Sequence, residues 1–98
     1  MIRYCFDLDG VLCSNEKDVY DAVPFVDRIN KVNRLYEQGH IILIDTARGT
    51  LTGKDHQRRT EEQLKKWGVK YHHLRTGIKF FADRYIDDKA LLDKDFFK

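Results

Sequence analysis

The sequence predicts a small α/β fold of three layers with a mostly parallel sheet and a single domain spanning residues 1–98. Three observations predict this fold. Apolar runs of strand length alternate with segments of helical periodicity along the chain. The run HIILID at 40–45 is apolar almost throughout, as expected for a strand buried on both faces. A chain of 98 residues has enough material for one modest core.

The first half of the chain reads as a strand, a loop and a helix. Residues 2–8 are apolar and aromatic enough for a buried strand, and 10–23 are charged without a clear period, which predicts a loop or small flap. Pro24 is expected at the first position of a helix, which ends at Gly39. Apolar side chains recur at helical spacing between them: Phe25, Ile29, Val32 and Tyr36.

The second half repeats this order. After the strand at 40–45 and a loop, a helix is predicted over 55–67, with Thr60, Leu64 and Trp67 facing inward and Gly68 ending it. Further elements are expected as follows: a third strand at 69–74, a short fourth strand at 84–88, and a brief helix or turn at 90–98. Right-handed crossovers would place the helices on the faces of a Rossmann-like sheet.

Composition narrows the functional classes. The chain has a net charge of +2, and acidic residues interleave its basic stretch at 56–66, so charge alone gives no argument for a nucleic-acid partner and does not exclude one. It has no apolar stretch near the ~20 residues that span a bilayer, and residues 1–8 lack the features of a signal peptide. We therefore expect a cytoplasmic protein without a membrane partner. Cys5 and Cys13 match no zinc or redox spacing and are expected to be free thiols.

Polar residues gather where the predicted strands end. Asp7 and Asp9 follow the first strand, Thr46 the second, and Asp87 and Asp88 the fourth. Ligands of parallel α/β sheets bind beyond the carboxyl ends of the strands, so these residues should converge on one edge. Carboxylates this close repel one another unless a cation joins them, and a small set of hard oxygen ligands suits Mg²⁺.

Such an edge supports phosphoryl transfer. A carboxylate can attack a phosphoryl group and form an aspartyl-phosphate, and Asp7 is the candidate nucleophile. Asp9 could donate a proton to the leaving oxygen and later activate water. Mg²⁺, Thr46, Lys79 and backbone N–H groups would stabilise the developing negative charge.

These residues resemble the motifs of the haloacid dehalogenase-like phosphohydrolases. DLDGV resembles their first motif, the strand that ends in Thr46 their second, Lys79 their third and YIDD their fourth. More narrowly, GHIILIDTARG and KFFADRYIDDKA are similar to the phosphatases of capsule and polysaccharide biosynthesis. The resemblance implies a Mg²⁺-dependent phosphatase with Asp7 as nucleophile and Asp9 as acid/base, acting on a small phosphorylated substrate, in particular a sugar phosphate.

The same resemblance implies roles for the remaining residues. Metal would be held by the Asp7 side chain, the Asp9 main-chain carbonyl and Asp87, with support from Asp88. Thr46 and Lys79 would hold the phosphoryl group, and Lys79 would also orient Asp7. The main-chain N–H groups near Leu8 and Ala47 are expected phosphate contacts. For Arg48, a substrate contact and a structural ion pair are equally open.

Two departures and several alternatives remain. Phe80 stands where the family often has a proline after the third-motif lysine. The intervals from Asp9 to Thr46 and from Thr46 to Lys79 leave no room for the cap domain that many relatives have. Access to the site would then depend on the flap at 10–23 or on a second subunit of a homo-oligomer. Open alternatives are a phosphatase of nucleic-acid 3′-phosphate ends or nucleotides, a receiver-like phosphoacceptor module, and a non-catalytic binding protein.

Overall fold

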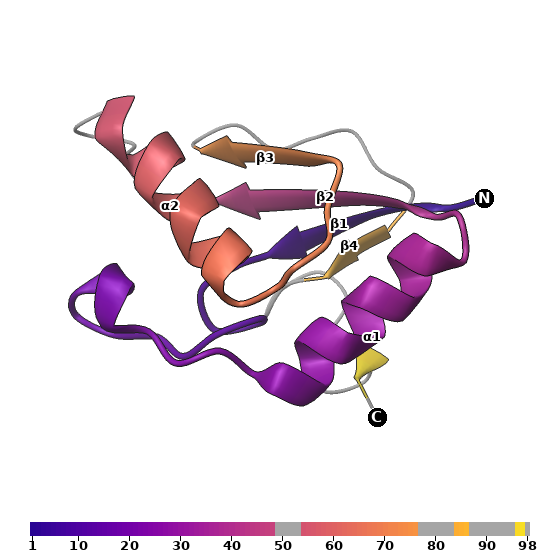
Figure 1. The fold of residues 1–98 in the computed structure, drawn as a ribbon, viewed down its shortest axis with the longest axis horizontal. Coiled ribbons are helices and arrows are strands. Elements are labelled where there is room, and N and C mark those ends of the chain that lie inside the picture. Colours follow the sequence, from indigo (N-terminus) through magenta and orange to yellow (C-terminus); the bar gives the residue numbers. More distant parts are fainter. Residues whose placement is uncertain (49–53, 77–83, 87–95, 98) are drawn as a thin grey trace.

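The structure, a computed structural model, describes residues 1–48, 54–76, 84–86 and 96–97. Its strands form one parallel sheet in the order β3-β2-β1-β4 (Figure 1). The elements of the described residues are β1 Arg3–Asp7, η1 Val19–Asp21, α1 Val26–Glu37, β2 Ile41–Thr46, α2 Lys54–Lys66, β3 His73–Thr76 and β4 Arg84–Ile86. The prediction of an α/β fold with a parallel sheet is confirmed.

One large cluster of buried side chains lies between the sheet and both helices. Alternate strand residues point to this face, and the buried side chains that meet there include Phe6, Ile42, Ile44, Ile29, Val32 and Leu64. Both α1 and α2 therefore cover the same face of the sheet (Figure 1). Cys5 and Leu43 are buried on the other face in a separate small cluster. In the described residues the helices α1 and α2 lie on one face only, so the third predicted layer is not among them.

The loop after β1 is partly core rather than flap. Val11, Leu12 and Cys13 are at most 1% exposed and belong to the main cluster. The N–H groups of Val11 and Leu12 both donate to the Leu8 carbonyl, which folds the chain back under the sheet edge. The expectation of a loop or small flap over 10–23 therefore fits only the later part, where η1 forms.

The start of α1 differs from the prediction. Pro24 forms an isolated bridge with Cys13, and Phe25 is the N-cap, so the prediction that Pro24 occupies the first helical position is wrong. The Phe25 N–H donates to the Leu12 carbonyl at 2.9 Å, which fixes the helix entry to the loop. At the other end, the prediction holds: Gly39 has φ +91°, and the bonds from Gly39 to Tyr36 and from His40 to Leu35 close the helix.

The helix α2 matches its prediction to within a residue, but the third strand does not. Thr60 and Leu64 are fully buried, and Gly68 has φ +72°. The strand predicted at 69–74 forms instead at His73–Thr76. Val69 closes the end of α2 by donating to the Leu64 carbonyl, so this residue cannot start a strand. None of the helices in the described segments is long and apolar enough to cross a membrane.

Candidate functional site

The candidate site lies at the carboxyl end of β1, between β2 and β4. The chain runs from β1 to β2 on one side of β1 and returns to β4 on its other side, so the direction of strand succession reverses here. Asp7 ends β1 and is paired in register with Asp45, next to Thr46 at the end of β2. On the other side, Ile86 ends β4 and pairs with Phe6. Because parallel α/β sheets bind ligands at such a reversal, the end of β1 at Asp7 is the candidate position for a ligand.

The turn after β1 brings Asp9 back toward the sheet edge. Asp7 is half-buried, and its Oδ1 accepts a hydrogen bond from the Leu8 N–H at 3.0 Å. Gly10 has φ +85°, a conformation that glycine adopts without strain, and its N–H donates to the Cys13 carbonyl at 2.8 Å. The turn requires a positive φ at this position, which explains why a glycine follows Asp9.

Asp9 is held by an arginine. Arg48 Nε donates to Asp9 Oδ2 at 3.0 Å, and Nη2 donates to Oδ1 at 2.6 Å. The Arg48 side chain is 2% exposed and that of Asp9 22% exposed. Thr46 Oγ1 lies 3.4 Å from Asp9 Oδ2 and accepts from the Arg48 N–H at 3.2 Å. Asp9 and Thr46, which the sequence places 37 residues apart, are thus brought together, and the Asp9 carboxylate is a bidentate partner of Arg48.

The rest of the Arg48 guanidinium is also engaged. Nη1 donates to Gln63 Oε1 at 2.5 Å, and Nη2 lies 3.3 Å from the Val19 carbonyl. Of the two roles left open for Arg48, the structure shows the ion pair. Sequence reasoning missed Gln63, although its position beside the inward stripe of Thr60 and Leu64 was a signal that a polar residue borders the core.

The Cys13 thiol adjoins the same pair without being reactive. Its Sγ lies 3.6 Å from both the Leu8 carbonyl and Asp9 Oδ1. Burial first, and then the neighbouring Asp9 charge, raise the pKa of Cys13 to about 12. The thiol therefore stays protonated at neutral pH and is no nucleophile.

The remaining predicted residues divide into two groups. Leu8 is buried and its N–H donates to Asp7, whereas Ala47 is exposed at the end of β2. Lys79, Asp87 and Asp88 lie outside the described residues. Among residues 1–48, 54–76, 84–86 and 96–97, no three His, Cys, Asp or Glu side chains are grouped as a metal site. The predicted metal site includes Asp87, which lies outside the described residues, so the search of the described residues does not test that site.

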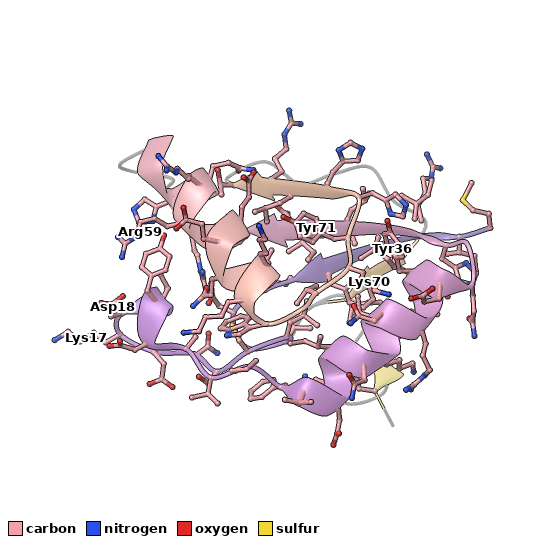
Figure 2. The ribbon with its side chains drawn as sticks, in the orientation of Figure 1. Lys17, Asp18, Tyr36, Arg59, Lys70 and Tyr71 are labelled. Atoms are coloured by element: carbon pink, nitrogen blue, oxygen red, sulfur yellow. The ribbon has the colours of Figure 1, made fainter. Side chains whose placement is uncertain are left out.

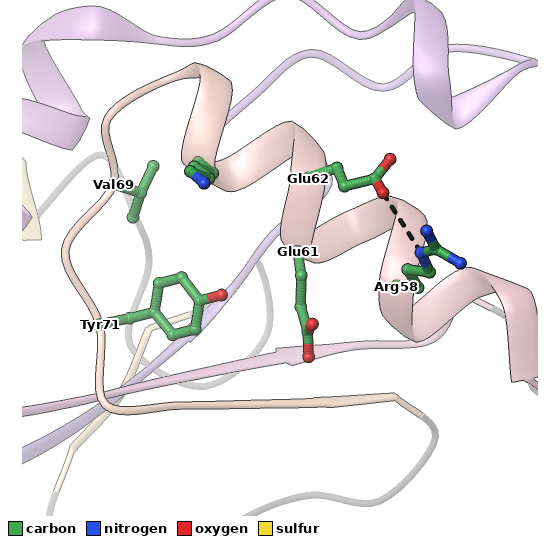
Figure 3. Close-up of a pocket in the computed structure, with 6 residues that line it drawn as sticks. Arg58, Glu61, Glu62, Val69 and Tyr71 are labelled. Carbon is green, nitrogen blue, oxygen red and sulfur yellow. Dashed lines mark ion pairs between the residues drawn. The ribbon is translucent and has the colours of Figure 1, made fainter.

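Two hollows flank α2. One of about 480 Å³ is lined by Arg58, Glu61, Glu62, Lys65, Val69 and Tyr71, and Figure 3 shows the ion pair of Arg58 and Glu62 on its helix side. Its charges are mixed, and none of the predicted site residues lines it. The second, of about 290 Å³, is lined by Tyr20, Ala22, Arg59, Glu62, Gln63, Lys66 and Trp67. Through Gln63, this second hollow adjoins the Arg48 network.

Comparison with known proteins finds solved structures that resemble this chain. The sequence matches no family model and no curated protein. A crystal structure of a structural-genomics target from Vibrio cholerae superposes with a TM-score of 0.77 at 29% identity, covering 99% of this chain and 88% of that chain. A chain in the structure of the Pnkp1/Rnl/Hen1 complex superposes with a TM-score of 0.60 at 19% identity, covering 85% of this chain and 31% of that chain. The second likeness concerns the fold alone.

Proposed function

We propose that this protein is a Mg²⁺-dependent phosphomonoester hydrolase of the haloacid dehalogenase-like type that works through an aspartyl-phosphate on Asp7. One observation carries the proposal: Asp9 contacts Thr46 of β2 beside Asp7, the last residue of β1, at the carboxyl edge where the strand succession reverses. A turn or helix-capping role for these residues does not require such convergence.

The proposed reaction has two steps. An Asp7 carboxylate oxygen attacks phosphorus, the bond from phosphorus to the ester oxygen breaks, and the leaving alcohol takes a proton from Asp9 or from water. Water then attacks the aspartyl-phosphate, the Asp9 carboxylate accepts its proton, and Asp7 and inorganic phosphate are released. Both Asp9 oxygens accept hydrogen bonds from Arg48, so each proton transfer would require Asp9 to exchange one of these bonds for a bond to the alcohol or to water.

The residues present fit Mg²⁺ by their chemistry. The Asp7 carboxylate, the Asp9 main-chain carbonyl and Asp87 would hold the ion, and all three supply hard oxygen donors. The Asp9 side chain is engaged by Arg48 and Thr46, which leaves its main-chain carbonyl as the donor. When bound, the ion would polarise the phosphoryl oxygens and offset their charge.

A sugar phosphate of capsule or polysaccharide biosynthesis is the substrate class we propose, with the protein in the cytoplasm. The support is the likeness of GHIILIDTARG and KFFADRYIDDKA to phosphatases of that branch. Nucleotides and nucleic-acid 3′-phosphate ends belong in the same substrate screen, because none of the described contacts selects the leaving group.

The test is phosphate release from an aryl phosphate, with Mg²⁺ and with EDTA. An aryl leaving group needs little protonation, so the assay does not depend on acid catalysis by Asp9. We expect Asp7→Asn to abolish turnover, while Asp27→Asn, the same change at an exposed residue of α1, leaves it unchanged. Asp9→Asn should slow turnover severely and still bind Mg²⁺. Turnover by Asp7→Asn near the wild-type rate would remove Asp7 as the nucleophile.

A further inference from the structure

We propose that Gln63 and Tyr20 are positioning residues that dock η1 on α2 and thereby hold Arg48 on the acid/base Asp9. This inference rests on the proposed function for its effect on turnover, but the contacts it describes can be tested without activity. It gives a role to the segment around η1, which the sequence predicts to be part of a loop or small flap.

Gln63 connects three parts of the chain through one side chain. Its Oε1 accepts from Arg48 Nη1 at 2.5 Å, and its Nε2 donates to the Val19 carbonyl at 3.2 Å. The same carbonyl lies 3.3 Å from Arg48 Nη2, which closes a ring of hydrogen bonds among Arg48, Gln63 and Val19. An amide supplies the acceptor and the donor that this ring needs at one position.

Tyr20 makes the second connection between η1 and α2. Its ring lies under the Arg59 guanidinium, 3.8 Å from the ring centroid, and its hydroxyl is 2.8 Å from His56 Nδ1. The Arg48 guanidinium lies 5.4 Å from the same centroid. Figure 2 shows Arg59 on α2 beside η1, whose N-cap is Asp18. Because His56, Arg59 and Gln63 recur at helical spacing, one face of α2 receives η1.

The consequence for Asp9 follows from the burial of Arg48. Both Asp9 oxygens are fixed by a guanidinium that is almost wholly buried and whose other edge is fixed by Gln63 and Val19. Removing the Gln63 acceptor leaves a buried donor unpaired, so Arg48 shifts toward another partner and Asp9 moves with it. An acid/base acts only within hydrogen-bond reach of the reacting atoms, so turnover falls while substrate binding changes little.

The kinetic test compares Gln63→Leu with Gln63→Glu, which keeps an acceptor for Arg48. We expect Gln63→Leu to lower kcat about tenfold, in the range typical of groups that orient a catalytic ligand, with KM within about twofold of wild type. Gln63→Glu should recover part of that loss. Gln57→Leu, the same change elsewhere on α2, serves as the matched control and should keep the wild-type kcat.

A double-mutant cycle separates positioning from a structural effect. If Gln63 acts through Asp9, Gln63→Leu lowers kcat in the wild-type background and has no further effect in Asp9→Asn. An equal loss in both backgrounds overturns the proposal. Tyr20→Ala is tested in the same cycle, so the answer does not depend on the folding of one variant.

A second readout needs no turnover: hydrogen exchange of the Arg48 Nε–H, followed by NMR. We expect this proton to exchange faster in Gln63→Leu and Tyr20→Ala than in wild type, and at the wild-type rate in Gln57→Leu. Unchanged exchange in both variants overturns the proposal. A wild-type protein without Mg²⁺-dependent turnover would instead refute the proposed function, and the exchange rates would still decide whether Gln63 and Tyr20 hold Arg48.

Discussion

Replacing Arg48 by methionine tests the central electrostatic feature of the site. Arg48→Met removes the charge and every side-chain donor while filling similar space. It leaves Asp9 without the two charge-assisted bonds it receives at 3.0 and 2.6 Å. The change should therefore lower the free energy of unfolding much more than a typical surface substitution does.

The magnitude follows from burial. Breaking a fully buried ion pair by removing one partner costs about 3–5 kcal/mol, because a charge is left uncompensated. The Asp9 side chain is 22% exposed, so water can partly solvate its charge. The expected loss of unfolding free energy therefore lies at the lower end of this range. We expect a loss of about 3 kcal/mol, a large share of the 5–15 kcal/mol typical of a domain.

The assay is urea denaturation followed by the fluorescence of Trp67, the single tryptophan of the chain. In the double variant Arg48→Met/Asp9→Asn, no charge is left uncompensated, so about 2 kcal/mol should be recovered relative to the sum of the single changes. Arg58→Met, which removes an exposed ion pair with Glu62, should cost less than about 0.5 kcal/mol. A cost below about 1 kcal/mol for Arg48→Met, or strict additivity in the double variant, would refute this reasoning.

Two further predictions concern buried polar groups. The Thr60 hydroxyl is buried without a hydrogen-bond partner in the part of the chain that the structure describes, so Thr60→Val should leave the unfolding free energy unchanged or raise it by up to about 1 kcal/mol in the same urea assay. Burial raises the pKa of Cys13 from 9.0 to about 12. The unfolded thiol ionises first, so stability should fall as pH rises from about 9 toward 12, and a Cys13→Ala variant should show a shallower fall in denaturation measured across that range.

Much of the fold could be predicted because its signals are local. Continuous apolar runs identified β1 and β2, and Gly39 and Gly68 ended both helices at positions where the backbone has positive φ. The parallel sheet then followed from the order of the elements. Since parallel strands end at one edge, the meeting of Asp9 with Thr46 was also implied by the sequence.

The errors arose where long-range contacts decide the conformation. Pro24 is a favourable first helical residue, but bonds from the loop after β1 made Phe25 the N-cap. Val69 and Tyr71 are apolar enough for a strand, yet Val69 is used to close α2. His72 is held against β2, where its Nδ1 accepts from the Ile42 N–H at 3.0 Å and its ring stacks on Tyr36. No local sequence pattern predicts these long-range hydrogen-bond and stacking partners.

Arg48 changes how the acidic cluster must be understood. From the sequence we predicted a bound cation because several carboxylates were expected at one edge of the sheet, and the Asp9 carboxylate was counted among them. The chain itself compensates the Asp9 charge through an arginine 39 residues away, a pairing that spacing alone does not indicate. In the proposed site, Arg48 and Lys79 would offset two of the four carboxylates. One divalent cation would then suffice to neutralise the rest, beside Asp7 and apart from the Asp9 side chain.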